Sequence, residues 1–349
     1  VKRAVEEFSA SSASGVIMDV KTGEILAGVS LPDFDPHDPG GAPKEALFSH
    51  LTQGAYELGS VFKVFSTAAL FESRNVPMGT MFDAREPLKR GRYTINDYHA
   101  KDRILTLPEV FMYSSNIGSA MMGEAVGTDA LKAFYEDLGL LTPLELEIRE
   151  TAHPIVPSPW RDINALTASY GHGVATTPVQ LVTAVSSIVN GGLLVKPSVV
   201  LHDATAQTPD SSAHIRVVSE RTAEKMRELL RLVVTDGTGS KADVKGYQVG
   251  GKTGTAEKLV NGRYDRTKRM SSFVGVFPMD APRYAVFVIV DEPKGNKDSF
   301  GYATGGWVAA PAVARTVVSM AAILGLPPES PSRLDPASPL KQYISTAGD

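Results

Sequence analysis

Segments with the pattern of β-strands lie at both ends of the chain and enclose a long helical block. Near the N-terminus, residues 14–29 alternate apolar and polar side chains around a turn at Thr22-Gly23, which is typical of a hairpin. Three further strand-like runs follow late in the chain, at 246–260, 271–278 and 283–293. Strands from both ends that share one sheet around a helical insert predict a single α+β domain.

Capping signals mark the helices. Within the central block, 106–192, the pattern Thr106–Glu109 fits a capping box, and Thr177–Gln180 combines an N-cap threonine with Pro at the first helical position. Ser219 begins another helix that runs to about residue 235, and a last helix covers 307–326. The block between the strands is therefore mostly helical.

These elements predict one domain over residues 1–326, with a helical subdomain at about 68–175 inserted between the sheet-forming segments. Residues 327–349 form a Pro/Ser-rich C-terminal tail that we expect to be loosely ordered. We expect no membrane span, because the longest apolar run found, 284–290, has only the length of a strand. The sequence begins at Val1, so we expect a fragment whose natural N-terminus, possibly with an anchor, lies outside it.

Composition excludes several functions. The 349 residues carry a formal net charge of −4 and have a pI near 6.0, so no basic surface for nucleic acid is expected. The chain has no cysteine, which rules out disulfides and thiolate metal sites. Its seven histidines show no metal-ligand spacing, so no metal and no cofactor are expected; His172 is interpreted as a packed histidine.

A lysine in an apolar helix gives the first chemical signal. Residues 56–73 predict a helix that is apolar on nearly every face, with Ser60, Lys63 and Thr67 along one stripe. A buried ammonium must be paired or lose its proton, and a neutral lysine one turn from a serine is a suitable general base. The S-x-x-K pattern alone is weak, because such a lysine more often extends to solvent.

Each short motif in the chain has a second copy. S-x-x-K recurs at Ser338–Lys341, S-x-N occurs at 114–116 and at 73–75, and K-T-G occurs at 252–254 and at 21–23. Order and context select one set. Ser60 begins a buried helix, Ser114 lies in a break between helices, and Lys252 lies on a strand.

The roles follow from residue type. Ser114 can relay a proton between Lys63 and a leaving amine, and Asn116 can hold a substrate amide. Lys252 adds a second cation, which lowers the affinity of Lys63 for a proton.

The strand that follows Lys252 supplies binding groups. Lys252, Thr253 and Thr255 offer a site for a substrate carboxylate. Gly254 leaves room for an extended peptide, and the backbone N–H groups of Ser60 and Thr255 can form an oxyanion hole.

A nucleotide-binding alternative comes from the same region. Residues 246–253, GYQVGGKT, match the phosphate-loop pattern, and Asp291 resembles a magnesium ligand at the end of a strand. A phosphate loop joins a hydrophobic strand to a helix, whereas the flanking segments here are polar before it and contain an Asn-Gly turn after it. The context does not fit, and Asp291 with Glu292 is interpreted as a strand end.

With these residues in view, the chain resembles the transpeptidase domain of class B penicillin-binding proteins, and among them the cell-division type, penicillin-binding protein 3. The S-x-x-K, S-D-N and K-T-G motifs occur together in penicillin-binding proteins and class A β-lactamases, and Ser114-Ser115-Asn116 takes the place of S-D-N here. MDVKTGEILA, YGHGVATTPVQLVTAVSSIVNGG, GGKTGTAEK and GGWVAAPAVARTV also look like family segments. The resemblance extends to about residue 325, and Leu58 stands where the family usually has Pro.

The resemblance implies a five-stranded antiparallel sheet flanked by helices with a mostly helical subdomain. It implies a peptidoglycan DD-transpeptidase of septal wall synthesis, in which a stem peptide ending in D-Ala-D-Ala acylates Ser60 and a neighbouring amine then accepts the acyl group. β-Lactams would bind covalently at Ser60. It also implies a membrane peptidoglycan polymerase and division proteins as partners, and a periplasmic location through an N-terminal anchor outside this fragment.

Two alternatives remain. A serine β-lactamase of class A deacylates with a Glu followed four residues later by Asn, but Glu145, Glu147 and Glu150 have no Asn at that offset. A non-enzymatic penicillin sensor or division scaffold would bind or be acylated without turnover.

Overall fold

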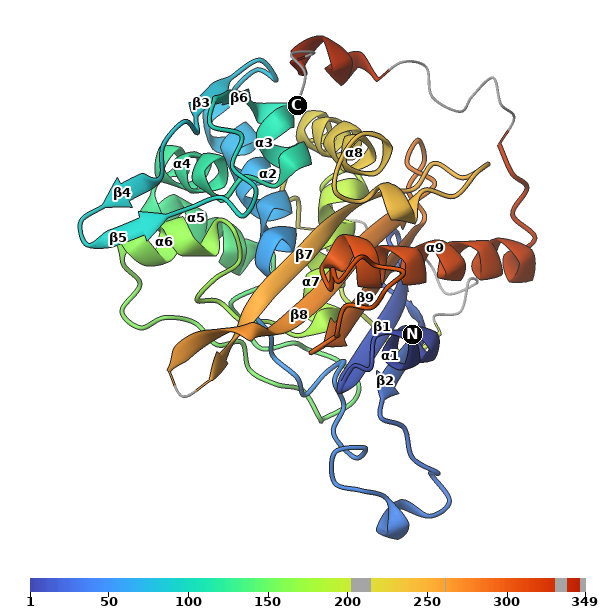
Figure 1. Cartoon of the computed structure of the whole chain (residues 1–349). Coiled ribbons are helices and arrows are strands. Elements are labelled where there is room, and N and C mark those ends of the chain that lie inside the picture. The colour runs from blue at the N-terminus through green and yellow to red at the C-terminus, as the bar shows by residue number, and fades with distance from the viewer. Residues whose placement is uncertain (202–214, 261, 330–337, 346–349) are drawn as a thin grey trace.

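An antiparallel sheet of five strands runs through the centre of the protein in the order β2-β1-β9-β8-β7 (Figure 1). The computed structural model describes residues 1–201, 215–260, 262–329 and 338–345. The strands are β1 (Ser12–Asp19), β2 (Ile25–Leu31), β7 (Gly250–Val260), β8 (Arg263–Phe277) and β9 (Tyr284–Asp291). The early strand β1 pairs with the late strand β9, with Ala13 opposite Val290. The predicted fold class is confirmed.

Helices cover the sheet and form a region beside it. They are α1 (Lys2–Glu7), α2 (Lys63–Arg74), α3 (Leu107–Tyr113), α4 (Asn116–Val126), α5 (Thr128–Asp137), α6 (Asp162–Ala168), α7 (Pro178–Val189), α8 (Glu220–Thr235) and α9 (Gly305–Leu324). Short 3-10 helices are η1 (Pro39–Gly41), η2 (Gly59–Phe62), η4 (Ser240–Ala242) and η5 (Pro339–Tyr343). Two small sheets pair β3 (Met81–Asp83) with β6 (Ile104–Thr106), and β4 (Leu88–Arg90) with β5 (Tyr93–Ile95).

Both faces of β9 are buried. On β9, Phe287 and Ile289 belong to the core that the sheet shares with α2, α7 and α8. The alternate residues Val286 and Val288 belong to a second core beneath α9 and α1. Because successive side chains on a strand point to opposite faces, burial on both sides explains why this strand is apolar at nearly every position.

The opening helix lies at the centre of the helical region. Residues 63–71 of α2 are all buried, and α2 packs against α4, α5 and α8. The sequence predicted one helix over 56–73, whereas the structure has the 3-10 turn η2 first and begins the α-helix at Lys63. The predicted bounds of the helical subdomain, 68–175, stay a prediction.

Strand β8 is longer than expected. The apolar pattern predicted a strand at 271–278, but β8 begins at Arg263, and its polar first half pairs with the end of β7, Val260 opposite Arg263. This half is largely exposed, so it lacks the apolar alternation that identifies a strand.

Helix α9 corrects the expectation that no apolar segment reaches the length of a membrane span. It has 20 residues and an 18-residue window of mean hydropathy 1.6. In the described part of the chain, no other helix is both long enough and apolar enough to span a membrane. Its inner face packs on β8 and β9, and 44% of that window is buried. The inner face of α9 is apolar because it covers the sheet, as a core helix of a soluble protein does.

The C-terminal tail is partly folded. Residues 338–345, which were expected to be loosely ordered, contain η5 and place Leu340 in the main core at 2% exposure. Residues 330–337 and 346–349 of that tail lie outside the described residues.

Candidate active site

The segment that carries Ser60 turns tightly against strand β7. Gly59 has φ +56°, and a Cβ at this position would lie 2.7 Å from Thr255 O. Only glycine combines this backbone conformation with so close an approach. Ser60 follows in η2 and lines a cavity of about 1020 Å³.

Lys63 is fully buried, at 0% exposure. Its Nζ lies 2.5 Å from Ser114 O, 3.1 Å from Ser114 Oγ and 2.8 Å from Asn116 Oδ1. Burial, and secondly the positive charge of Lys252, lowers the pKa of Lys63 well below its ordinary value, while Asp97 acts in the opposite direction. Lys63 does not extend to solvent, and the lowered pKa favours its neutral form.

A second buried lysine approaches the same hydroxyl. Lys252 of β7 has 0% exposure, and its Nζ donates to Ser114 Oγ at 2.9 Å. Burial lowers the pKa of Lys252 to about 7. Ser114 is the C-cap of α3 and has φ +62°, which turns it from the helix end into the space between the two amines. Ser114 Oγ can therefore exchange a proton with either lysine.

Asp97 was missed by the sequence analysis. Its carboxylate accepts hydrogen bonds from Ser115 Oγ at 2.7 Å, Asn116 N at 2.5 Å and Ile117 N at 3.0 Å, and so holds the start of α4. Asp97 follows β5 in an exposed polar loop and has no motif, so only its place in space reveals it. The Asn116 amide is also anchored: Nδ2 donates to Asn96 O at 3.0 Å, and Oδ1 accepts from Lys63.

Strand β7 forms one wall of the cavity. It is an edge strand, so one row of its backbone groups points away from β8. Thr253 and Thr255 line the cavity; Thr253 Oγ1 is 2.8 Å from Thr238 Oγ1, and Thr255 Oγ1 accepts from Gly305 N at 3.1 Å. A Cβ on Gly254 would lie 2.5 Å from the backbone O of Leu58, so the glycine lets the Ser60 segment approach the strand.

The rest of the cavity wall is rich in charged and aromatic side chains. It includes Lys101, Lys241, Glu257, Arg266, Arg269, Tyr98, Tyr113, Tyr302 and Trp307. Among the residues that the structure describes, no group of three or more His, Asp or Glu could hold a metal ion.

His172, which the sequence analysis interpreted as a packed residue, also lines the cavity. Its ring makes an edge contact with Tyr264 at 5.4 Å between centroids, and burial, followed by the charge of Lys63, lowers its pKa to about 4. Tyr264 OH donates to both carboxylate oxygens of Glu57, at 3.1 and 3.0 Å, and so ties β8 to the Ser60 segment.

The residues behind the nucleotide-binding and β-lactamase alternatives do not form the sites that those functions require. Lys252 of the phosphate-loop match lies inside a strand, and no helix follows it, so the geometry of a phosphate loop is absent from this stretch. Asp291 ends β9, and its carboxylate pairs with Lys258 at 2.9 Å. Of the three glutamates considered for deacylation, Glu145 pairs with Lys196 at 3.0 Å, and none is among the described residues that line the cavity.

A family model of the penicillin-binding protein transpeptidase domain matches residues 13–318, a span that includes every predicted site residue. This chain belongs to the penicillin-binding protein transpeptidase family. The resemblance noted from its motifs is thereby confirmed.

Among curated relatives, a probable peptidoglycan D,D-transpeptidase FtsI of Caulobacter vibrioides is 41% identical over 335 residues, covering 93% of this chain and 56% of the relative. Stage V sporulation protein D of Bacillus subtilis is 34% identical, covering 90% of this chain and 49% of the relative. The chain therefore spans about half the length of these two relatives.

Solved penicillin-binding protein structures share the fold. The transpeptidase domain of penicillin-binding protein 3 from Burkholderia pseudomallei aligns with a TM-score of 0.82 and 31% identity, covering 95% of this chain and 93% of that one. Penicillin-binding protein 3 from Mycobacterium tuberculosis, solved with aztreonam, aligns with a TM-score of 0.85 and 28% identity, covering 95% and 77%.

Proposed function

We propose that this chain is the catalytic domain of a peptidoglycan D,D-transpeptidase that cross-links stem peptides during septal wall synthesis through an acyl-enzyme on Ser60. The observation that carries the proposal is the convergence of two fully buried lysines on Ser114 Oγ, at 3.1 Å for Lys63 and 2.9 Å for Lys252, within the cavity that Ser60 lines. Family membership supports the same reaction.

The lysines and serines form a route for protons. Neutral Lys63 takes the proton of Ser60 as Oγ bonds to the carbonyl carbon of the penultimate D-Ala. The proton then passes through Ser114 Oγ to the nitrogen of the terminal D-Ala as the C–N bond breaks. In the second half, the amine of a neighbouring stem peptide bonds to the same carbon, and one of its protons passes through Ser114 Oγ and Lys63 to Ser60 Oγ as the ester bond to Ser60 breaks.

The walls of the cavity provide substrate contacts. The Ser60 and Thr255 backbone N–H groups stabilise the oxyanion, and Thr253, Thr255 and Lys252 face the terminal carboxylate. Asn116, fixed by its partners, presents its remaining Nδ2 hydrogen to a peptide carbonyl.

Slow hydrolysis separates this proposal from a β-lactamase. None of Glu145, Glu147 and Glu150 is followed by Asn at the offset that a class A β-lactamase uses, and Glu145 pairs with Lys196 instead. A β-lactam should therefore acylate Ser60 and stay attached. A sensor or scaffold would also be acylated but would release no D-Ala from a peptide.

The proposal also covers the partners and the location of the protein. The chain covers 56% of the relative named as a probable peptidoglycan D,D-transpeptidase FtsI. We expect the natural protein to act on the outer side of the cytoplasmic membrane, held there by a segment outside this sequence, together with a peptidoglycan polymerase and division proteins.

The test is D-Ala release and transfer. The purified chain is incubated with a peptide ending in D-Ala-D-Ala and an amine acceptor such as glycine, and products are followed by mass spectrometry. We expect equal amounts of D-Ala and of the acceptor adduct, and neither with Ser60→Ala. Acylation by penicillin without D-Ala release would favour the sensor, and rapid penicillin turnover would favour the β-lactamase.

A further inference from the structure

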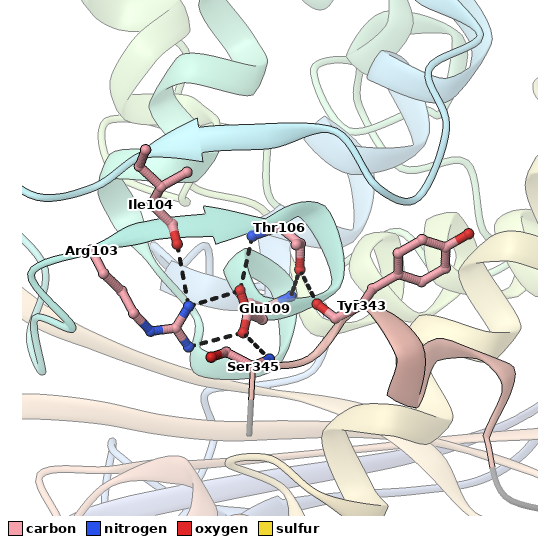
Figure 2. Close-up of polar contacts among 6 residues, drawn as sticks. All are labelled: Arg103, Ile104, Thr106, Glu109, Tyr343 and Ser345. Carbon is pink, nitrogen blue, oxygen red and sulfur yellow. Dashed lines mark hydrogen bonds and ion pairs between the residues drawn. The ribbon is translucent and has the colours of Figure 1, made fainter. Parts of the chain in front are cut away.

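The C-terminal segment 338–345 lies against the helix that leads to Ser114 (Figure 2). Tyr343 O accepts a hydrogen bond from Thr106 Oγ1 at 2.8 Å, and Ser345 N donates to Glu109 Oε1 at 2.8 Å. Leu340, at 2% exposure, inserts into the main core. The segment thus joins α3 by both hydrogen bonds and apolar burial, although it follows α3 by more than two hundred residues.

Glu109 is the centre of this contact. The residue is 1% exposed, and its carboxylate accepts from both terminal nitrogens of Arg103 at 2.9 and 3.0 Å, from Thr106 N at 2.9 Å and from Ser345 N. Burial acts to raise the pKa of Glu109, but these hydrogen bonds outweigh it and hold the pKa below its usual range. A buried carboxylate needs its full set of donors, so loss of the tail contact leaves an oxygen undersatisfied.

Helix α3 links this carboxylate to the active site. It has only seven residues, with Glu109 in its first turn and Ser114 as its C-cap. A helix this short moves as a unit, so a shift at Glu109 displaces Ser114 relative to both lysines. Arg103 adds a second link, because its guanidinium lies 5.8 Å from the ring centroid of Tyr113, which lines the cavity.

The segment 338–345 also contacts α8, which leads to another part of the cavity wall. η5 packs against α8, and Lys341 Nζ is 4.0 Å from Asp236, the residue that ends α8. Asp236 is followed by Gly237 and Thr238, which line the cavity. The segment therefore contacts two elements that end at the active site.

We propose that residues 338–345 are a positioning element for the transpeptidase reaction, which act through Glu109 and α3 to hold Ser114 between the two lysines. None of them touches the substrate cavity among the described residues that line it. This inference rests on the proposed acylation of Ser60.

The first test compares two truncations of this chain. One lacks 338–349, and its control lacks only 346–349, which leaves the docked residues in place. The measurement is the second-order rate of acylation by benzylpenicillin across pH. A displacement of a proton-relay group by about 1 Å costs up to roughly a hundredfold. We expect the longer truncation to acylate between tenfold and a hundredfold more slowly, and the control to match the full chain.

The pH profile separates positioning from loss of folded protein. A displaced α3 admits water to Lys63, and since burial is the main cause of its lowered pKa, the rising limb of the profile should move to higher pH. A smaller folded fraction would lower the amplitude and leave the limb in place. A synthetic peptide of residues 338–349 should restore the rate saturably, and the same peptide with Leu340→Ala should restore it poorly.

A point variant covers the case in which the longer truncation does not fold. Ser345→Pro removes the N–H that donates to Glu109, whereas Ser345→Ala keeps it. We expect the Pro variant to acylate more slowly than the Ala variant, with the same shift in pH profile. Equal rates and profiles for the Pro and Ala variants, or a folded truncation that acylates like the full chain, would overturn the inference. If the full chain itself were not acylated, the proposed function would fail instead.

Discussion

Single residues set the chemistry, and two of them are charged groups that burial pushes toward neutrality. Lys63 and Lys252 have 0% exposure and share Ser114 Oγ. Desolvation is the largest cause of the lowered pKa of each. Asp97 opposes this for Lys63, and it also fixes Asn116, which contacts the same amine.

Removal of Asp97 should therefore change rate and pH dependence together. Asp97→Ala takes away three hydrogen bonds at the start of α4 and the nearby negative charge. We expect slower acylation, by roughly tenfold or more on the scale of one misplaced group. The rising limb of the pH profile should move to lower pH, since the pKa of Lys63 falls further. Asp97→Asn is the matched control, because it keeps the Oδ1 acceptor of the hydrogen bonds but removes the charge. An acylation rate for Asp97→Ala equal to that of the wild type would contradict the role of Asp97 in holding the site.

Elements position these groups, and η2 packs closely against β7. Gly59 and Gly254 face each other's segments: a Cβ on the first would lie 2.7 Å from Thr255 O, and one on the second 2.5 Å from Leu58 O. The short distance that joins Ser60 to the strand depends on both glycines.

Gly254→Ala should separate the two elements. Overpacking of this kind typically costs about 1–3 kcal/mol of the free energy of unfolding, and we expect acylation to slow as well. Gly40→Ala is the control, because Gly40 has no positive φ and the nearest atom to its Cβ would be 4.0 Å away. Chemical denaturation measures both variants; if Gly254→Ala is as stable and active as Gly40→Ala, the close packing is not required.

The sequence predicted elements where local signals were strong. Thr106 with Glu109 and Thr177 with Gln180 form the capping boxes that their spacing indicated. The first half of β8 was missed because it is exposed and polar. Asp97 and the docking of Leu340 depend on contacts between segments far apart in the chain, which leave no periodic pattern. The S-x-x-K copy at Ser338 is part of that docked segment, where Ser338 caps η5.

At the scale of the whole molecule, burial of the lysines lowers the free energy of unfolding by an amount that depends on pH. An unfolded chain keeps the proton on Lys252 up to the ordinary lysine pKa of 10.5, whereas the folded protein loses it at about 7. Because the unfolded state then binds more protons, the free energy of unfolding should rise with pH above about 7.

Lys252→Met tests this linkage. Between about pH 7 and pH 9, the free energy of unfolding of the wild type should rise relative to that of the variant by up to roughly 1.4 kcal/mol per pH unit. Lys63 is present in both proteins, but loss of the Lys252 charge raises its pKa in the variant, so the shift of Lys63 forms part of the measured difference. Denaturant titrations at several pH values give the difference; parallel curves would mean that Lys252 keeps its proton in the folded state.

Ser60 is the proposed nucleophile of a slowly deacylating enzyme. The most direct measurement is intact-protein mass after incubation with excess benzylpenicillin, followed over hours, with peptide mapping and with Ser60→Ala alongside. We predict one adduct of benzylpenicillin mass, mapped to Ser60, stable over hours and missing from the variant. An adduct that maps elsewhere or persists in Ser60→Ala, or no adduct at any time, would contradict the account.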